Sequence, residues 1–393
     1  MTQTKRYEKK RYKARLVTVT LLVSAALVMC AAPGVSQEAA GGVIESERET
    51  FRLVEVTRGL SHPWSIAFLP DGTALVTERP GRLQRLHADG STEQISGLPQ
   101  IAAGGQGGLL DVALDPDYDQ NGWIYFTYST PYDGGSGTTV GRARLSGSSL
   151  QDFEELFRMD APGSGRLHFG SRMAFLPDGT LVFSIGDRGQ MQRAQDPMDH
   201  AGALLRINRD GSIPQDNPFV GDANARDELY TLGNRNPQGL AVHPQTGVLW
   251  QTEHGPRGGD ELNIIEAGNN YGWPEMSQGV DYRTGQPIGQ GTSAPGMTQP
   301  VEHWSPAIAP SGMAFSFGEQ FPEWEGSLFL GSLVDRHLLR LELDGNNRVA
   351  HQERLLDGTI GRIRDVRLGP DGNLWLLTDD SNGGVYRLEP VQQ

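Results

Sequence analysis

Short apolar stretches that alternate with polar residues, joined in pairs by tight turns, recur along most of the chain. A strand, a Pro-Asp-Gly-like turn and a second strand occur six times, in segments that begin at residues 66, 112, 173, 240, 315 and 366. In the fourth segment, Leu240 and Val242 precede a turn at 244–247, and Val248 and Trp250 follow it. The pattern therefore predicts six antiparallel hairpins.

The spacing of these hairpins leaves room for two more strands in each repeat. Units of four strands at this spacing are typical of β-propeller blades. Helical periodicity is nearly absent. We predict an all-β fold, a six-bladed β-propeller with four-stranded antiparallel blades, formed by a single catalytic domain at residues 51–390. A β-helix or a two-sheet sandwich is the alternative, but unequal repeat lengths disfavour the first and the number of hairpins disfavours the second.

The N-terminal region has the features of an export signal: a basic start, an apolar stretch over residues 16–29 and small residues after it. This stretch is shorter than the ~20 residues of a membrane-spanning helix. We expect residues 1–36 to be a signal that is cleaved near Gln37, or a lipoprotein-type signal acylated at Cys30. Residues 37–50 would form a short flexible linker. The protein would be periplasmic or otherwise exported, and attached to a membrane only if lipidated.

Composition excludes several kinds of site. The formal net charge is −14 and no basic cluster follows the leader, which argues against nucleic-acid binding. Cys30 is the only cysteine, so an exported fold has no disulfide. The sequence also lacks nucleotide-binding glycine motifs, the His/Cys spacing of zinc sites and a serine nucleophile motif.

Polar residues gather where each predicted hairpin begins and ends. Since the two strands are antiparallel, the residues before the first and after the second lie on one face of the propeller. Arg235, Arg362 and Arg364 would repel one another there unless an anion lies between them, and either the protein's own acids or a polycarboxylate ligand could supply it. The alternative role for any single polar residue at a strand end is to satisfy loop backbone groups.

A loop after the fourth hairpin reads HGPRGGDELN and includes Gly255, Pro256, Asp260 and Glu261. Carbonyl and carboxylate oxygens are ligands for a hard cation such as Ca²⁺. The segment therefore favours a cation site near the arginines.

Seven segments resemble, in order, the conserved blocks of the soluble quinoprotein aldose and glucose sugar dehydrogenases. They are GQGGLLDVALDP, HFGSRMAFLPDGTLVFSIGD, GNRNPQGLAVHP, TEHGPRGGDELNII, GNNYGWP, HWSPAIAPSGMAF and GRIRDVRLGPDGNLWLLTD. The resemblance extends over residues 52–388. It implies a six-bladed propeller that holds pyrroloquinoline quinone (PQQ) and Ca²⁺. Such an enzyme would oxidise aldose sugars at C1 to lactones by hydride transfer to the quinone, and pass electrons to an external quinone, dye or cytochrome.

The resemblance also implies roles for individual residues. His168 matches the general base that takes the proton of the anomeric hydroxyl, and Asp187 the acid that orients it. His254 is thereby a weaker candidate for the base. The remaining matches are to cofactor-binding positions (Gln106, Arg235, Asn236, Arg362 and Arg364), to carbonyls that hold the catalytic Ca²⁺ (Gly255 and Pro256), and to a structural calcium site (Glu261 and Tyr271, with Asp281 and Tyr282 as further candidates).

Some positions depart from the family pattern. Leu167 replaces an acid before the histidine, and Ala307 replaces a threonine that contacts the cofactor. A cofactor-contacting lysine corresponds to Val334 or Asp335, with Arg336 as a possible substitute. These changes resemble the broader aldose sugar dehydrogenase branch more than the strict glucose enzymes. A Ca²⁺-dependent propeller lactonase and a noncatalytic propeller that binds sugar or protein remain the alternative functions.

Overall fold

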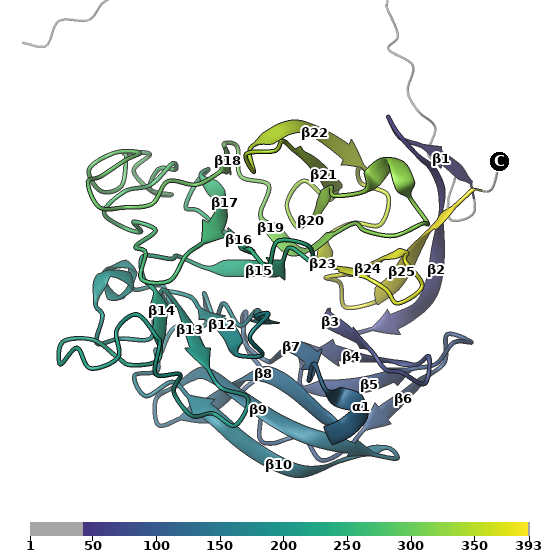
Figure 1. Ribbon diagram of the computed structural model, residues 1–393, viewed down its shortest axis with the longest axis horizontal. Helices are drawn as coiled ribbons and strands as arrows, with labels where there is room; N and C mark the ends of the chain where they lie inside the picture. Colours follow the sequence, from purple (N-terminus) through teal and green to yellow (C-terminus); the bar gives the residue numbers. More distant parts are fainter. Residues whose placement is uncertain (1–41, 392–393) are drawn as a thin grey trace, which may run out of the picture. The chain divides into compact units, whose positions relative to one another are not determined.

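The computed structural model describes residues 42–391, and its strands form six antiparallel sheets arranged around a common axis (Figure 1). This arrangement is a six-bladed β-propeller, so the predicted fold class is confirmed. Helical segments within 42–391 are limited to single short turns: α1 (Tyr118–Asn121), η1 (Met191–Gln195) and η2 (Pro322–Trp324).

The first five blades each use four consecutive strands, of which the first is innermost. Blade 1 contains β3 (Pro63–Phe68), β4 (Ala74–Glu78), β5 (Arg82–Leu86) and β6 (Thr92–Ile95). Blade 2 contains β7 (Leu109–Leu114), β8 (Trp123–Tyr132), β9 (Gly135–Ser146) and β10 (Ser149–Arg158). Blade 3 contains β11 (Met173–Phe175), β12 (Leu181–Ile185), β13 (Ala203–Ile207) and β14 (Leu229–Thr231).

Blades 4 and 5 follow the same order. Blade 4 contains β15 (Pro237–Val242), β16 (Leu249–Glu253), β17 (Asp260–Ile265) and β18 (Glu302–Trp304). Blade 5 contains β19 (Pro310–Phe315), β20 (Leu328–Ser332), β21 (Leu338–Leu343) and β22 (Val349–Leu355). All six predicted hairpins are present, although the inner strand of the fifth lies before Phe315 rather than after it.

Blade 6 joins the two ends of the described chain. Its inner strands are β23 (Ile363–Leu368), β24 (Leu374–Thr378) and β25 (Gly383–Pro390), and its outer strands are β2 (Thr50–Leu60) and β1 (Val43–Glu45). Strand β2 pairs with β25 from Phe51 opposite Pro390 to Leu60 opposite Gly383. Strand β1 pairs with β2, so residues 43–45, which we expected in a flexible linker, instead form a strand at the sheet edge.

The hydrophobic core lies between neighbouring blades. Six clusters of buried apolar side chains are each shared by two adjacent blades, and together they follow the whole ring. A seventh cluster, made of Trp64, Leu110 and Phe169, lies at the inner strands of blades 1 to 3. Because each blade buries one face against each neighbour, the ring holds the inner strand ends in a fixed arrangement.

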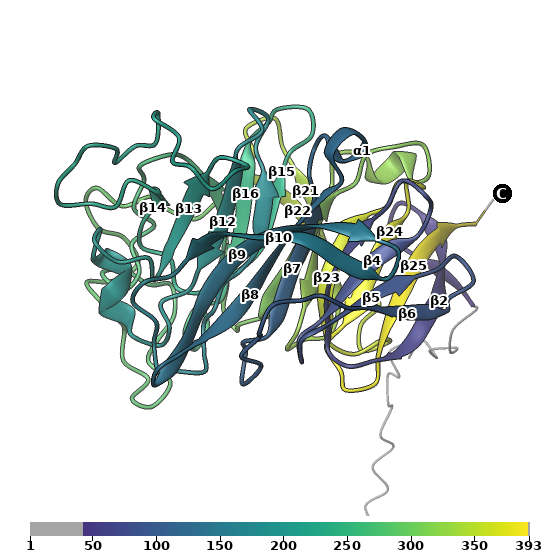
Figure 2. The same ribbon diagram turned by 90° about the horizontal axis from the view of Figure 1, so that it is seen from below.

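The inner strands β3, β7, β11, β15, β19 and β23 surround the axis, and each contacts the next around the closed ring. Figure 2 shows the sheets from the side, with the strands running between the two faces of the ring. The Pro-Asp-Gly-like turns lie at one end of the inner hairpins. The polar residues predicted to share a face lie at the opposite end.

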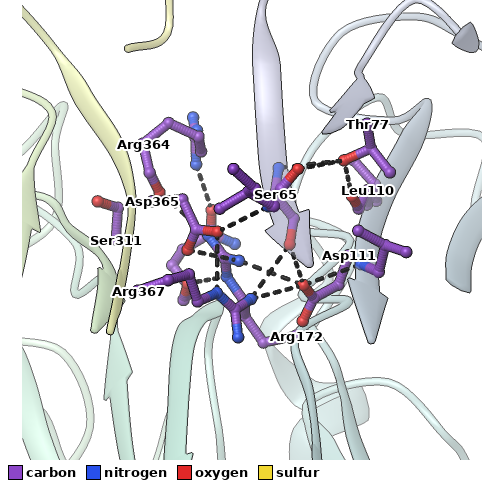
Figure 3. Close-up of polar contacts among 12 residues, drawn as sticks. Ser65, Thr77, Leu110, Asp111, Arg172, Ser311, Arg364, Asp365 and Arg367 are labelled. Carbon is purple, nitrogen blue, oxygen red and sulfur yellow. Dashed lines mark hydrogen bonds and ion pairs between the residues drawn. The ribbon is translucent and has the colours of Figure 1, made fainter. Parts of the chain in front are cut away.

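A buried charge cluster occupies the axis, as Figure 3 shows. The guanidinium of Arg172 is 1% exposed and lies 2.9 Å from Asp365 and 3.4 Å from Asp111. Arg367 pairs with the same two carboxylates at 3.0 and 2.7 Å. Two arginines and two aspartates balance each other, as buried charges require. Arg172 also donates to the Arg364 carbonyl at 3.0 Å, which fixes the backbone of one predicted cofactor-binding residue.

Within residues 42–391, no helix is long and apolar enough to cross a membrane. The predicted export signal at 1–36, with Cys30, lies outside the described residues.

Candidate active site

His168 and Asp187 form a hydrogen-bonded pair at the face opposite the hairpin turns. The His168 Nδ1 lies 2.6 Å from the Asp187 Oδ1. His168 precedes β11 and Asp187 follows β12, so the antiparallel hairpin brings them to one edge, as predicted. A carboxylate partner at Nδ1 assigns the ring proton to that atom, which leaves Nε2 as the acceptor.

The loop before β11 holds His168 in an unusual backbone conformation. Its φ is 53°, in the left-handed region, and its backbone N–H donates to the Gln106 Oε1 at 2.6 Å. A Cβ at Gly186 would lie 2.4 Å from the His168 carbonyl oxygen, so only glycine permits this approach. Backbone strain of this kind is typical of functional sites.

Asp187 is almost fully buried and ionised. Burial raises the pKa of Asp187, but the hydrogen bond and charge of His168 outweigh it and leave the pKa below its ordinary value. The Gly189 N–H also donates to its Oδ1 at 2.7 Å. The charged carboxylate therefore has defined partners that hold it against the imidazole.

The pair lies in a cleft of about 400 Å³, which we call the dyad cleft. Its walls include Gln106, Leu167, His168, Asp187, Arg235 and Trp273. Gln106 also lines a second pocket of about 150 Å³ at the inner strands, which we call the arginine pocket. The walls of that pocket include Trp64, Arg79, Phe169, Arg362, Arg364 and Asp379. The two spaces therefore adjoin at Gln106.

The arginine pocket has more positive than negative charge. Its three arginines share one carboxylate, Asp379, which lies 2.9 Å from Arg364, 3.2 Å from Arg362 and 3.9 Å from Arg79. Burial raises the pKa of Asp379, but Arg364 and the His62 hydrogen bond outweigh it and lower the pKa strongly. The Nε of Arg364 is buried without a hydrogen-bond partner within the described chain. A planar anion would satisfy both the charge and this donor.

Arg235 and Asn236 lie before β15 in blade 4. Arg235 lines the dyad cleft, but neither residue is among those that line the arginine pocket. The Arg235 guanidinium donates to the carbonyls of His254 and Gly255, at 3.0 and 2.5 Å, and its buried Nε has no partner within residues 42–391. Asn236 is buried behind the cleft, where its Oδ1 accepts from the Gly170 N–H at 3.3 Å.

The four residues predicted to hold calcium line one small cavity of about 10 Å³, the acidic cavity. Its walls include Glu253, Gly255, Pro256, Glu261, Tyr271 and Trp273. This volume has room for about one water-sized particle. Among residues 42–391, no group of three or more His, Cys, Asp or Glu side chains forms a metal site, so backbone oxygens would have to contribute.

Glu253 and Glu261 are paired across strands β16 and β17 and are both buried. Burial raises the pKa of Glu253 to about 7. Burial, and then the charge of Glu253, raise the pKa of Glu261 well above its ordinary value. Two buried carboxylates in this position lack charge compensation, which a cation would provide.

His254 has a different environment from His168. Burial lowers its pKa to about 3, and its ring Nε2 donates to the Pro310 carbonyl at 2.8 Å. The ring therefore stays neutral and its Nε2 is already bonded.

The departures from the family pattern lie at the rims of these spaces. Leu167 is 49% exposed in the dyad cleft and Val334 is 57% exposed at the arginine pocket. Arg336 and Ala307 are not among the residues that line the arginine pocket. Asp281 and Tyr282, the further calcium candidates, line the dyad cleft rather than the acidic cavity, because their loop extends over the cleft.

Sequence reasoning missed several residues in these walls, among them Arg79, Gln238 and Trp273. Arg79 directly follows β4, so the strand-edge argument could have found it. Gln238 lies inside β15, where its Oε1 accepts from Arg364 at 2.9 Å. Trp273 lies in the long loop between β17 and β18 and had no signal other than the GNNYGWP motif.

Comparisons with known proteins agree with this geometry. A family model described as glucose/sorbosone dehydrogenase matches residues 60–387. Aldose sugar dehydrogenase YliI of Escherichia coli K12 is 43% identical over 337 residues, which cover 84% of this chain and 91% of the relative. Quinoprotein glucose dehydrogenase B of Acinetobacter calcoaceticus is 27% identical over 424 residues, which cover 87% of this chain and 88% of the relative.

A solved structure is also similar. The PQQ-bound form of an aldose sugar dehydrogenase from Streptomyces coelicolor matches with a TM-score of 0.72 and 31% identity, over 86% of this chain and 98% of that one. With a family match over most of the propeller, the chain belongs to the glucose/sorbosone dehydrogenase family of sugar-oxidising propellers.

Proposed function

We propose that the protein is a PQQ-dependent aldose sugar dehydrogenase that oxidises aldoses at C1 to lactones and passes the electrons to an external acceptor. The observation that carries this proposal is the position of the His168–Asp187 pair beside a pocket with surplus positive charge. A base and an anion-binding pocket that adjoin at Gln106 suit a reaction between a sugar and a bound polycarboxylate.

The residues of the arginine pocket fit PQQ. Three arginines with one carboxylate partner and the unpaired Arg364 Nε suit its carboxylates, and Trp64 and Phe169 offer apolar walls to a flat ring system. Gln106, Arg362 and Arg364 would hold it from the walls of this pocket, and Arg235 from the adjoining dyad cleft, with Asn236 buried behind them. When bound, PQQ would supply the electrophile that accepts the hydride and its two electrons.

His168 would take the proton of the anomeric hydroxyl at Nε2 while the C1–H bond breaks. Asp187 would hold the Nδ1 proton and stabilise the imidazolium that forms. A partly formed alkoxide donates hydride better than an alcohol does, so the base raises the rate of the oxidation. The exposed side of the dyad cleft would admit the sugar.

The acidic cavity fits Ca²⁺, because its carboxylate and carbonyl oxygens are hard donors. Glu261 and the Tyr271 carbonyl would hold a structural ion. The carbonyls of Gly255 and Pro256 would hold a separate ion, the one that polarises the acceptor, outside this cavity on the side of the dyad cleft, which Pro256 also lines. The Gly255 carbonyl oxygen now accepts a hydrogen bond from the Arg235 guanidinium, which is also a cation. The bound ion would take the place of that guanidinium.

The test of this function is dye reduction by the purified protein with several aldoses, with and without added PQQ and Ca²⁺. We expect activity only when both are present and a lactone as product. Hydrolysis of added lactones with Ca²⁺ alone would instead support the lactonase alternative. No dye reduction with any aldose, together with no change in the PQQ absorbance, would reject the proposal.

Replacing Glu261 by glutamine should stabilise the calcium-free protein at pH 8. Because the folded-state pKa values of Glu253 and Glu261 are raised, their contribution to stability is full below about pH 4.5. The contribution of Glu253 is lost as the pH rises through about 7, and that of Glu261 as the pH rises through its own raised pKa. E261Q removes one of the two charges. We expect its Tm at pH 8 to exceed the wild-type value by roughly 2–4 °C, the shift for about 1 kcal/mol.

Added Ca²⁺ should raise the Tm of the wild type by more than that of E261Q, which keeps only the carbonyl site at Gly255 and Pro256. The matched control is Glu266→Gln, an exposed glutamate just after β17, which should respond to Ca²⁺ as the wild type does. Equal stabilisation of E261Q and wild type by Ca²⁺ would show that the ion binds elsewhere.

A further inference from the structure

Trp273 contacts the oxygen of Asp187 that His168 leaves free. Its indole Nε1 donates to the Asp187 Oδ2 at 2.8 Å, and both groups are buried. The Oδ1 of the same carboxylate binds His168 and the Gly189 N–H. Within residues 42–391, the indole is the hydrogen-bond donor to Oδ2. Each carboxylate oxygen therefore has its own partner.

The backbone of Trp273 is itself held by blade 3. Its N–H donates to the Gly233 carbonyl at 2.9 Å, and its carbonyl accepts from the Gln195 side chain at 2.7 Å. Gln195 also exchanges two hydrogen bonds with Asn270, at 2.7 and 3.0 Å. The indole is thus fixed from the same blade that carries the His168–Asp187 pair.

The indole ring also separates two of the spaces described above. Trp273 lines both the dyad cleft and the acidic cavity. The Arg235 guanidinium lies over its ring, and the distance from the guanidinium carbon to the ring centre is 5.2 Å. Any rotation of the ring would therefore disturb both spaces. With Arg235 over the ring and the indole N–H bonded to Asp187, the orientation of the Trp273 side chain is fixed.

We infer that Trp273 is a positioning residue for sugar oxidation, which acts on His168 through the second oxygen of Asp187. The inference rests on the proposed function of His168 as the base. Without a donor on Oδ2, the carboxylate can turn about its Cβ–Cγ bond and move Oδ1 out of line with Nδ1–H. The indole N–H opposes this turn, so the carboxylate stays aligned with Nδ1–H and the unprotonated Nε2 stays directed at the cleft.

The kinetic test compares Trp273→Phe with Trp304→Phe, both assayed with PQQ and Ca²⁺. Phenylalanine keeps an aromatic face under Arg235 but removes the donor together with one of the two indole rings. W304F loses the same atoms at another buried tryptophan and therefore controls for the lost volume. We expect W273F to lower kcat by about 10- to 100-fold, the range for a lost hydrogen bond to a charged group. The KM and the PQQ affinity should stay near wild-type values. Trp304 is the matched control, because its indole donates to the neutral Gln352 at 3.0 Å.

A second test needs no cofactor and no sugar. The measurement is NMR of protein labelled with ¹⁵N-histidine, in which the His168 signals are identified as those that H168Q lacks. His168 should show a single tautomer, with its proton on Nδ1. In W273F it should show both tautomers. In otherwise wild-type protein the Trp273 indole N–H signal should move on Asp187→Asn, which tests the contact even if W273F does not fold.

Wild-type kcat in W273F, an equal loss in W304F, or an unchanged indole signal in D187N would each overturn the inference. Because the tautomer and indole signals do not depend on turnover, they decide the role of Trp273 even if the wild type oxidises no aldose. Conversely, an active wild type with an equally active W273F would leave the proposed function intact and reject only this role.

Discussion

Replacing His168 by alanine should lower kcat for aldose oxidation by about 10²- to 10⁴-fold, the range for loss of a positioned general base. The physical reason is that the other titratable groups near the cleft are poor substitutes. Asp281 also lines the cleft, but hydrogen bonds from Thr284 lower its pKa, which makes it a weak base. His254 has a pKa lowered to about 3 and an Nε2 bonded to Pro310, and Asp187 is buried behind the imidazole. The measurement is steady-state dye reduction together with a PQQ titration of the same protein.

The PQQ affinity of H168A should stay close to that of the wild type, because the imidazole does not line the arginine pocket. His87→Ala is the matched control, since His87 is a partly exposed histidine at the outer end of β5, away from the dyad cleft. Normal turnover by H168A would show that another group is the base.

Replacing Arg364 by alanine should weaken PQQ binding by about 30- to 1000-fold, as expected when one partner of a buried charge pair is removed. Arg364 is 8% exposed and binds Gln238 and Asp379 through its two terminal nitrogens, which leaves Nε to face a ligand. Its loss removes one of three positive charges and leaves Asp379 to repel an anionic cofactor. The measurement is the absorbance change on titration of the apo-protein with PQQ.

Arg364→Lys should give an intermediate affinity, because lysine keeps the charge but loses the planar fork. Arg387→Ala is the control variant, because Arg387 lies on β25 of the same blade, pairs with Glu389 and lies outside the arginine pocket. Its PQQ affinity should equal that of the wild type. An R364A titration that matches the wild type would remove Arg364 from the cofactor site.

The sequence was sufficient for the fold and for one edge of the site because both follow from local patterns. Two-residue alternation and Pro-Asp-Gly turns specify the hairpins, and strand direction alone places His168 beside Asp187 and Arg235 beside Gly255. Six repeats of one unit then leave few architectures other than a propeller.

The remaining contacts depend on ring closure and on loops without periodicity. Trp273 reaches Asp187 across 86 residues, from a long loop between β17 and β18. Arg172 looks in sequence like the start of an ordinary strand, and its pairing with Asp111 and Asp365 exists only when blades 2, 3 and 6 meet at the axis. The opposition of Glu253 and Glu261 is set by the register of β16 and β17, which the sequence pattern does not fix.

The most direct test of sugar oxidation at this site is a single turnover without an external acceptor. Under anaerobic conditions, protein loaded with PQQ and Ca²⁺ is mixed with an aldose or its C1-deuterated form, and the PQQ absorbance and the lactone are measured. We expect one lactone per bound PQQ, slower reduction with the deuterated sugar, and almost no reduction in H168A. An unchanged PQQ spectrum after mixing with aldoses, or reduction without lactone, would contradict it.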